Sequence, residues 1–235
     1  MTNLATQYDA IAAAFSAVHN EGGNSNRDNR AVFYTHLSGI KPSTQLLDVA
    51  CGDGLDLVHY VRLGATVMGI DASAELLAIA RTRLPGVELY CGDFSSIPFA
   101  DESFDMVVSK YALQTAPDMR RVFEEMHRVL KPGGTLCFLV THPLRQYLER
   151  KDTACDYFAQ TIVDSVILNA TVVVKEPTHT LNEYLNPWFL TRFDVRVCEE
   201  HWDAAAEQIG GGKYPGYLIV KAVKRERKIK TAADY

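Results

Sequence analysis

Several features that mark common protein classes are missing from this 235-residue sequence. Its five cysteines, at positions 51, 91, 137, 155 and 198, form no CxxC pair and no cysteine–histidine cluster with metal-ligand spacing. This pattern predicts no metal site, free thiols within apolar runs at positions 51, 91 and 137, and a reducing, cytoplasmic compartment. No hydrophobic run approaches the roughly 20 residues that cross a bilayer, so no membrane partner is expected.

The sequence also has no excess of positive charge, with 24 Lys and Arg residues against 29 Asp and Glu residues. The formal net charge is −5 and the isoelectric point is about 5.8, which argues against nucleic acid as a partner of the whole molecule. The one basic stretch, residues 221–230, is predicted to be a solvated chain end, and a nucleic-acid arm is the alternative. The hydrophobic content of 47% is ordinary for a globular chain that buries one core.

Short apolar runs alternate with helical patterns between about residues 44 and 141. Strands are predicted over 45–50, 65–72, 87–93, 104–112 and 135–143, with helices over 54–64, 73–86 and 118–130. Such alternation gives an α/β fold, a Rossmann-like, doubly wound and mostly parallel sheet. Later runs predict a helix over 180–189 and strands over 193–201 and 214–224, which brings the expected sheet to seven strands.

The regular alternation of strands and helices ends after residue 143, and this change predicts how a single domain, 1–235, is organised. Residues 41–143 form the expected cofactor-binding core, and 181–235 supply a closing helix and strands. The segments 1–40 and 144–180 are predicted to cap the carboxyl ends of the strands, with 19–30 as a mobile polar loop. Five aromatic side chains of this region are candidates for the wall of an apolar pocket: Tyr147, Tyr157, Phe158, Tyr184 and Trp188.

The sequence "LLDVACGDG", residues 46–54, ends the first strand in a glycine turn. A dinucleotide-binding turn has the pattern GxGxxG, but Leu57 stands at the position of the third glycine. Asp53 and Asp56 lie at the start of the following helix, where their charges are expected to repel a pyrophosphate. The turn is therefore atypical of a nicotinamide oxidoreductase, which stays as a rival hypothesis.

Three successive strands each end at an acidic residue: Asp48, Asp71 and Asp93. Asp71 follows Gly54 by 71 − 54 = 17 residues, the region where an acid accepts the hydroxyls of a ribose. Any one of these acids is as readily a turn former. Three of them beside a Gly-x-Gly turn indicate a nucleoside cofactor with a positively charged end.

Three further stretches follow this turn in order: "GIDAS", "GDFSSIPFADESFDMVVSKYALQTAPD" and "EEMHRVLKPGGTLCFLV". Together they resemble the class I S-adenosylmethionine (SAM)-dependent methyltransferases. Within that superfamily the pattern is similar to the small-molecule branch typified by the ubiquinone- and menaquinone-biosynthesis enzymes. The resemblance spans roughly residues 44–141.

The resemblance implies SAM as the cofactor and a role for each matching residue. Asp48 and the turn residues are implied to hold the methionine moiety, Asp71 the ribose, and Asp93 with Phe94 the adenine, while Ser109 lines the cavity near the sulfonium. Arg30 is a further candidate for the SAM carboxylate. The full predicted cofactor set is Arg30, Asp48, Ala50, Cys51, Gly52, Gly54, Asp71, Ala72, Gly92, Asp93, Phe94 and Ser109. Ala50 departs from the glycine common in the family, and Lys110 is assigned no contact because a cation beside a sulfonium is unfavourable.

Methyl transfer to an acceptor that must lose a proton needs a base. The candidates are His142, directly after the fifth strand, and His179, with Tyr8 and Tyr111 as orienting groups. A turn residue bonded to backbone is the alternative for His142, and a helix-entry residue for His179.

The acceptor is expected to be a small molecule. No (Asn/Asp)-Pro-Pro-(Tyr/Phe) turn follows the fourth strand, where Ser109-Lys110-Tyr111-Ala112 stands instead, and no Pro-Cys nucleophile is present. We therefore predict methyl transfer to O, N or C of a metabolite, such as a natural product or quinone-like acceptor, by a monomer or homodimer. A non-catalytic SAM-binding module and a peptide or protein N-methyltransferase are the alternatives.

Overall fold

The computed structural model describes residues 4–20, 25–149, 156–167, 172–203 and 211–226. Its first half alternates helices and strands, as the apolar periodicity predicts. The elements are α1 (Leu4–Asn20), α2 (Ser25–Thr35), β1 (Gln45–Val49), α3 (Leu55–Arg62), β2 (Thr66–Asp71), α4 (Ala74–Arg83), β3 (Glu88–Cys91), β4 (Phe104–Lys110), the 3-10 turn η1 (Leu113–Thr115), α5 (Met119–Val129) and β5 (Leu130–Thr141).

The second half of the chain first forms elements outside the main sheet and then adds two more strands to that sheet. Its elements are α6 (Pro143–Leu148), the hairpin strands β6 (Ile162–Ile167) and β7 (Val172–Pro177), α7 (Leu181–Tyr184), α8 (Pro187–Arg192), β8 (Phe193–His201) and β9 (Tyr217–Lys224). The hairpin β6–β7 forms a separate two-stranded sheet.

Seven strands form the main sheet in the order β3-β2-β1-β4-β5-β9-β8. β1 to β5 pair in parallel, and β9 runs antiparallel to both of its neighbours. The predicted fold class is confirmed. The chain order reverses between β1 and β4, so the crevice at the carboxyl ends of these two central strands is where a ligand of this architecture binds.

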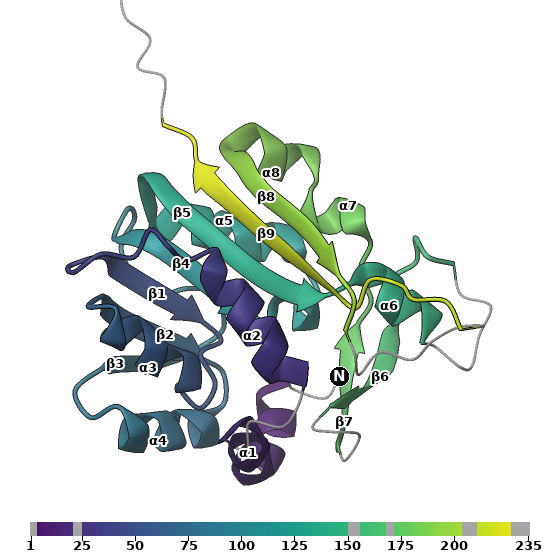
Figure 1. Ribbon diagram of the computed structural model, residues 1–235, viewed down its shortest axis with the longest axis horizontal. Coiled ribbons are helices and arrows are strands. Elements are labelled where there is room, and N and C mark those ends of the chain that lie inside the picture. Colours follow the sequence, from purple (N-terminus) through teal and green to yellow (C-terminus); the bar gives the residue numbers. More distant parts are fainter. Residues whose placement is uncertain (1–3, 21–24, 150–155, 168–171, 204–210, 227–235) are drawn as a thin grey trace, which may run out of the picture.

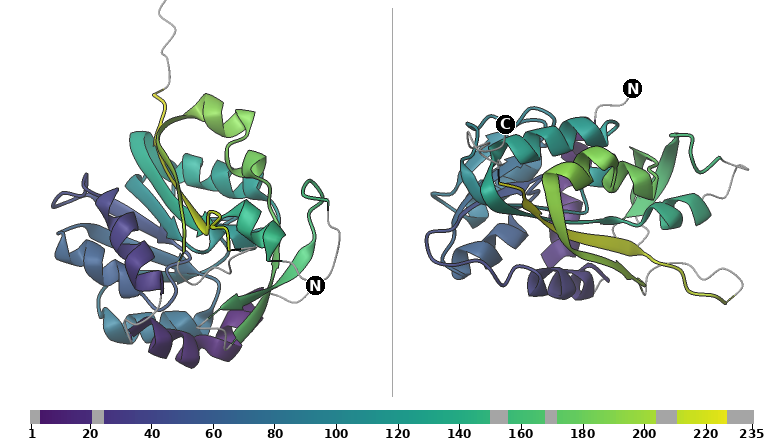
Figure 2. Two further views of the ribbon diagram at one scale, coloured as in Figure 1. Left: turned by 45° about the vertical axis from the view of Figure 1, so that its right-hand side comes forward. Right: turned by 90° about the horizontal axis from the view of Figure 1, so that it is seen from above.

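Helices cover both faces of the sheet. One core packs α5, α7 and α8 against the sheet through residues such as Phe123, Tyr184 and Phe189, and the other packs α2, α3 and α4 through residues such as Phe33, Leu57 and Leu77. Figure 2 shows these two layers on opposite sides of the sheet. Figure 1 shows α1, α6 and the β6–β7 hairpin beside the ends of the central strands.

Local signals fix the helix ends where the sequence predicts them. Ser73 caps α4 by accepting the N–H of Leu76 at 3.1 Å, and Asp118 caps α5 in the same way through Arg121. After α5 the chain extends at Leu130, and Gly133 takes the left-handed conformation with φ of 75°. The predicted stop after the strongest amphipathic helix is therefore confirmed.

Three predictions of local structure are wrong. The single helix expected over 180–189 is two helices, because Asn186 caps α8 and Pro187 cannot continue α7. The loop expected over 19–30 is largely helical, since α1 reaches Asn20 and α2 begins at Ser25. Cys91, expected within an apolar run, is exposed because β3 is an edge strand.

The basic stretch 221–230 is only in part a chain end. Residues 221–224 belong to β9, and the Lys224 ammonium is buried, donating to the carbonyls of Leu130 and His127 at 2.6 and 2.8 Å. Residues 227–230 and Cys155 lie outside the described residues.

Candidate functional site

The glycine turn after β1 requires backbone that side chains rarely adopt. Ala50, Gly52 and Gly54 have φ values of 61°, 55° and 74°, and Gly54 N–H closes the turn on the Cys51 carbonyl at 3.0 Å. A Cβ on Gly54 would meet that of Ala80 at 3.0 Å. Tyr111, directly after β4, is a second non-glycine outlier, with φ of 54°. Strain at the ends of the two central strands is typical of a binding site.

Asp71, at the end of β2, holds this turn in place. Its Oδ2 accepts the N–H of Gly52 and its Oδ1 that of Ser73, both at 2.8 Å. Burial raises the pKa of Asp71 even though these backbone donors favour the charged form. The Asp71 carbonyl accepts the N–H of Gly92, so the turn after β3 is joined to the same edge.

Asp48 and Ser109 lie beneath the turn, on β1 and β4. Asp48 is 4% exposed, and burial together with the charge of Asp56 raises its pKa well above the usual range. Ser109 is fully buried and donates to the carbonyl of Val49 at 2.8 Å, which ties the two central strands together.

The residues after β3 lie closer to solvent. Asp93 is exposed and accepts the N–H of Ser95 at 2.6 Å, as in a local turn, while Phe94 packs partly buried against the larger core. Ala72 accepts a long contact from the Cys91 thiol at 3.8 Å. The predicted cofactor residues of β1 to β4 thus share one edge of the sheet.

Asp56 carries a compact cluster of charges at the start of α3. Its Oδ1 is 2.7 Å from Arg30 Nε and accepts the hydroxyl of Tyr34 at 2.5 Å, and its Oδ2 is 3.4 Å from Lys110 Nζ. Burial opposes ionisation, but Lys110 and Arg30 outweigh it and lower the pKa of Asp56. Burial lowers the pKa of Lys110, with Asp56 opposing. The Lys110 ammonium therefore binds this carboxylate.

Asp53 is likewise paired, with Arg83 Nη1 at 3.0 Å from its Oδ2 and His19 Nδ1 at 3.5 Å from its Oδ1. The expectation that Asp53 and Asp56 repel a pyrophosphate is therefore wrong in its reasoning, because basic partners balance both charges. Leu57 remains as the feature against a dinucleotide turn, and it is fully buried in the core.

Arg30 differs from the other basic groups in one atom. Its Nε pairs with Asp56, but its Nη2 is buried and has no hydrogen-bond partner among the described residues. A buried donor without an acceptor is unfavourable, so this nitrogen is available to an anionic group beside the turn.

Helix α1 packs against α4 and β7 near the carboxyl ends of the parallel strands. Asp9 accepts the Ser73 hydroxyl at 2.6 Å and the N–H of Glu75 at 3.2 Å, while Gln7 exchanges hydrogen bonds with the backbone of Lys175 on β7. The pKa of Tyr8 is raised by burial and then by the carboxylates of Glu176 and Asp71. Tyr8 therefore connects the cofactor edge with the inserted hairpin.

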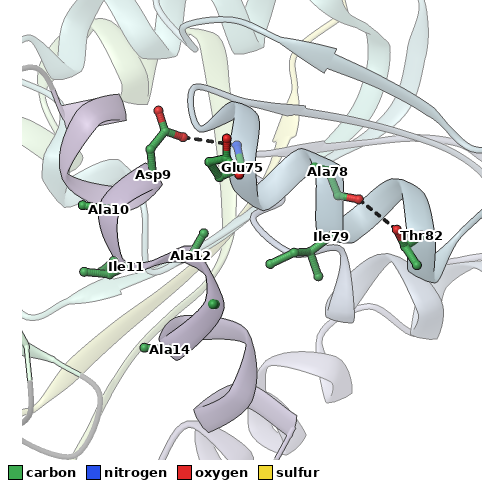
Figure 3. A pocket seen from close by; sticks show the side chains of 10 residues that line it. Asp9, Ala10, Ile11, Ala12, Ala14, Glu75, Ala78, Ile79 and Thr82 are labelled. Carbon is green, nitrogen blue, oxygen red and sulfur yellow. Dashed lines mark hydrogen bonds between the residues drawn. The ribbon is translucent and has the colours of Figure 1, made fainter.

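A hollow of 610 Å³ lies between α1 and α4, and Figure 3 shows its lining. Residues 10–14 of α1 line it together with Ala78, Ile79 and Thr82 of α4, and Ala12 points toward Ile79. None of the predicted site residues lines this hollow, so the catalytic chemistry is to be sought at the strand ends.

His142 is engaged at both ring nitrogens. Its Nδ1 accepts the N–H of Leu144, which caps α6, and its Nε2 is 2.8 Å from Glu200 Oε1. This places the proton on Nε2, and burial lowers the pKa of the ring. Its role as a base stays a prediction that requires one of these bonds to break.

His179 is buried between two acceptors. Its Nδ1 is 3.2 Å from Glu183 Oε1, and its Nε2 is 3.1 Å from the carbonyl of Gln114. Each ring nitrogen thus faces an acceptor oxygen, and a role as base requires one of these contacts to be exchanged for the substrate. The predicted role of His179 therefore also stays a hypothesis. Tyr111, the second orienting candidate, accepts the Asn29 amide at 2.6 Å.

Sequence reasoning missed the polar residues around His179. Glu176 is 3% exposed and accepts both the Ser165 hydroxyl at 2.8 Å and the Gln146 amide at 3.0 Å on its Oε1. Two further oxygens, Gln114 Oε1 and the Tyr184 hydroxyl, are buried and have no partner among the described residues. The only sequence signal is an acid closing an apolar β-branched run, "VVVKEP".

The expected aromatic wall is only partly formed. Tyr184 is fully buried beside His179, with ring centroids 5.6 Å apart. Phe158 is 82% exposed, and Trp188 lies between the guanidinium groups of Arg120 and Arg192. The prediction is wrong for these two residues, because one faces solvent and the other closes the outer face of α5.

Asp53 gives a prediction for stability in acid. Burial alone would raise its pKa, but His19 and Arg83 lower it from 3.8 to about 2. A carboxylate with a lowered folded pKa stabilises the fold above its unfolded pKa and loses that contribution as the pH falls toward the folded one. We expect Asp53→Asn to lower the free energy of unfolding by about 2 kcal/mol at neutral pH, with the difference vanishing between about pH 4 and pH 2.

Urea denaturation at a series of pH values measures this difference. Asp164→Asn is the control, because Asp164 is 61% exposed in its pair with Lys175, and we expect it to change the free energy of unfolding by less than about 1 kcal/mol. A difference for Asp53→Asn that stays constant down to the acid limit would contradict the prediction.

Comparison with known proteins agrees with the strand order and the turn. Residues 47–138 match the family model described as a methyltransferase domain. The core of the chain is therefore similar to known methyltransferase domains. The matched residues include most of β1, all of β4 and the acids Asp48, Asp71 and Asp93.

A demethylmenaquinone methyltransferase of Paenarthrobacter aurescens is 32% identical over 144 residues, covering 60% of this chain and 56% of the relative. The chain thus spans about half the length of the first curated relatives it matches. A crystal structure of a SAM-dependent methyltransferase from Mesorhizobium loti aligns with a TM-score of 0.68 at 24% identity, covering 86% of this chain and 99% of that one. The structure of the [4+2]-cyclase SpnF aligns equally well, with a TM-score of 0.68 at 19% identity over 94% of each chain.

Two absences hold for the part of the chain that the structure describes. Within it, no helix is both long and apolar enough to cross a membrane. Within the same residues, no three histidine, cysteine or carboxylate side chains are grouped so that they could hold a metal ion.

Proposed function

We propose that this protein transfers a methyl group from SAM to a small-molecule acceptor. The observation that carries the proposal is the strained turn of Ala50, Gly52 and Gly54, held by Asp71 and flanked by the unpartnered Nη2 of Arg30. A turn of this kind, without a third glycine at Leu57, suits an adenosine cofactor that has no pyrophosphate.

The residues present fit the charges of SAM. Its methionine end has a carboxylate, for which Arg30 Nη2 is a buried donor in need of an acceptor, and an ammonium, for which the buried Asp48 is the nearby acid. Asp71 would hold the ribose with Ala72 beside the adenine, while Gly92, Asp93 and Phe94 would hold the adenine itself. The backbone of Cys51 and the buried Ser109 complete this set.

When bound, SAM supplies a methyl group on a positively charged sulfur that is an excellent leaving group. The chain's own contribution is then mainly positioning, since orientation of two reactants supplies a large share of the rate. Tyr8 and Tyr111 are the orienting candidates on either side of the edge, and His142 or His179 would take a proton only after one of its present bonds breaks.

Fold alone does not decide the reaction, because a [4+2]-cyclase has the same architecture. A non-catalytic SAM-binding module and a peptide N-methyltransferase predict different results in one measurement. Incubation with SAM labelled in the methyl group and a broad metabolite extract would label small molecules if our proposal holds. No labelled product, or label only in peptides, would favour one of the alternatives.

The cofactor site itself is tested by S-adenosylhomocysteine (SAH) binding. We expect micromolar affinity for the wild type and at least about tenfold weaker binding for Asp71→Ala, since this change removes both the ribose acceptor and the bonds that hold the turn. Isothermal titration calorimetry measures both values. Asp164→Ala, on the exposed β6, is the matched control and should bind SAH like the wild type. Absence of SAH binding by the wild type would overturn the proposed function.

The finer expectations remain proposals. A quinone-like acceptor is supported by the names of the relatives, demethylmenaquinone methyltransferases. We further propose that residues 1–40 and 144–180 act as a cap over the core 41–143, with 181–235 closing the single domain. A cytoplasmic location, a monomer or homodimer, and the absence of a nucleic-acid partner are predictions of the same standing.

A further inference from the structure

The buried carboxylate of Glu176 is held by one oxygen and leaves the other without a donor. Ser165 and Gln146 both donate to Oε1, and Oε2 accepts no hydrogen bond from the described residues. Glu176 is nevertheless 3% exposed, and burial raises its pKa. Oε2 is not one of the fully buried atoms that lack a partner, so this acceptor is open to a donor from outside the described chain.

Two neighbouring side chains each have a buried oxygen without a hydrogen-bond partner in the described chain. Gln114, 5% exposed, has an Oε1 without a partner, and the hydroxyl of the fully buried Tyr184 makes no hydrogen bond within the described chain. His179 joins them, since its Nε2 bonds the Gln114 carbonyl and its ring packs on Tyr184. The N–H of His179 also faces Gln146 Oε1 at 3.4 Å, which leads back to Glu176.

This buried polar cluster, defined as Gln114, Gln146, Glu176, His179 and Tyr184, adjoins the cofactor edge. Gln114 belongs to η1, which follows the central strand β4, and β7 contacts η1 as well as α1. α1 contacts both β7 and α4, and its Tyr8 feels the charges of Glu176 and Asp71, so the cluster lies on the same side of α1 as the residue expected at the ribose. Figure 1 shows β7 beside the ends of the central strands.

The charges of the cluster favour a neutral partner. Burial raises the pKa of Glu176, against the hydrogen bonds from Ser165 and Gln146 and the charge of Arg145. An ammonium group would meet the Arg145 guanidinium nearby, whereas a hydroxyl only has to donate a hydrogen bond. An unsatisfied buried acceptor discriminates strongly against analogues that lack the matching donor.

We propose that Glu176 Oε2, with Gln114 Oε1 and the Tyr184 hydroxyl, recognises a hydroxyl group of the methyl acceptor. This specificity role rests on the proposed methyltransferase function and deepens it. The acceptor is then a neutral small molecule with an O–H, which donates to Glu176 Oε2 or Gln114 Oε1 while its oxygen accepts the Tyr184 hydroxyl.

Binding of a matched pair of probes to the SAH-saturated protein tests this role. The probes are 1-naphthol and its ether 1-methoxynaphthalene, which differ by a hydrogen-bond donor, and affinity is followed by naphthalene fluorescence. We expect the wild type to prefer naphthol by at least about tenfold, because a hydrogen bond to a charged acceptor is lost with the ether. In Glu176→Gln, which keeps an oxygen for Ser165 and Gln146, the preference should fall below about threefold.

Two further variants complete the design. Tyr184→Phe removes a hydroxyl that bonds nothing in the described chain, so it should fold normally and still reduce the preference for naphthol. Asp164→Asn, on the same hairpin and 61% exposed, is the control and should keep the wild-type preference.

Equal affinity of the wild type for the two probes would overturn the proposal, as would a preference unchanged in both Glu176→Gln and Tyr184→Phe. Failure of either probe to bind a protein that binds SAH would also overturn it and leave the proposed function standing. A wild type that binds no SAH would instead remove the proposed function.

Discussion

Asp56→Ala should destabilise the protein by about 3–5 kcal/mol, because it removes the shared partner of two buried cations. The side chains of Arg30 and Lys110 are 14% and 6% exposed, and both bind this one carboxylate. Their ion pairs need not stabilise the fold relative to apolar residues, but loss of the anion leaves two desolvated positive charges close together. Chemical denaturation of the wild type and the variant measures the change in the free energy of unfolding.

A double-mutant cycle distinguishes this cause from a general effect of a buried substitution. Lys110→Met removes one of the two positive charges that Asp56 neutralises. The double variant Asp56→Ala with Lys110→Met should therefore lose clearly less free energy of unfolding than the sum of the two single changes. Asp164→Ala, which breaks the exposed pair with Lys175, should cost less than about 1 kcal/mol. Additive single effects, or a small effect of Asp56→Ala alone, would contradict the account of this cluster.

Gly54→Ala should destabilise the cofactor turn by about 2–4 kcal/mol, the second largest effect we expect. Two causes act together. The φ of 74° is strained for any residue with a side chain, and the new Cβ would lie 3.0 Å from Ala80 Cβ and 3.4 Å from its Cα on the neighbouring α4. Because the turn is part of the proposed site, SAH affinity should fall as well.

Two other glycines separate these causes. Gly86 has φ of 94° but open space around it, so Gly86→Ala isolates the strain and should cost about 1 kcal/mol. Gly39 has neither a positive φ nor a neighbour within 4 Å, so Gly39→Ala should leave stability nearly unchanged or slightly improved. Thermal and urea unfolding of the three variants would contradict the argument if Gly54→Ala were no more harmful than Gly86→Ala.

The candidate site joins a part that the motif predicted with a part that it did not. The acids at the strand ends and the glycine turn are close in space because parallel strands place their carboxyl ends at one edge. The charges of Asp53 and Asp56 were interpreted wrongly, since their partners come from α1, α2, α4 and β4, outside the motif. Spacing within a motif carries no information on such partners.

The sequence by itself determined the α/β core, the seven strands of the main sheet, the glycine turn and the positions of the helices α4 and α5. These depend on periodicity and on contacts between residues a few positions apart. Only the tertiary structure decided that Arg30 and Lys110 share Asp56, that Gln7 joins Lys175 across 168 positions, and that the buried Glu176 accepts its hydrogen bonds from Gln146 and Ser165 on one oxygen. The physical reason is that burial and charge pairing depend on which distant segments the packed fold brings together, which a local pattern does not specify.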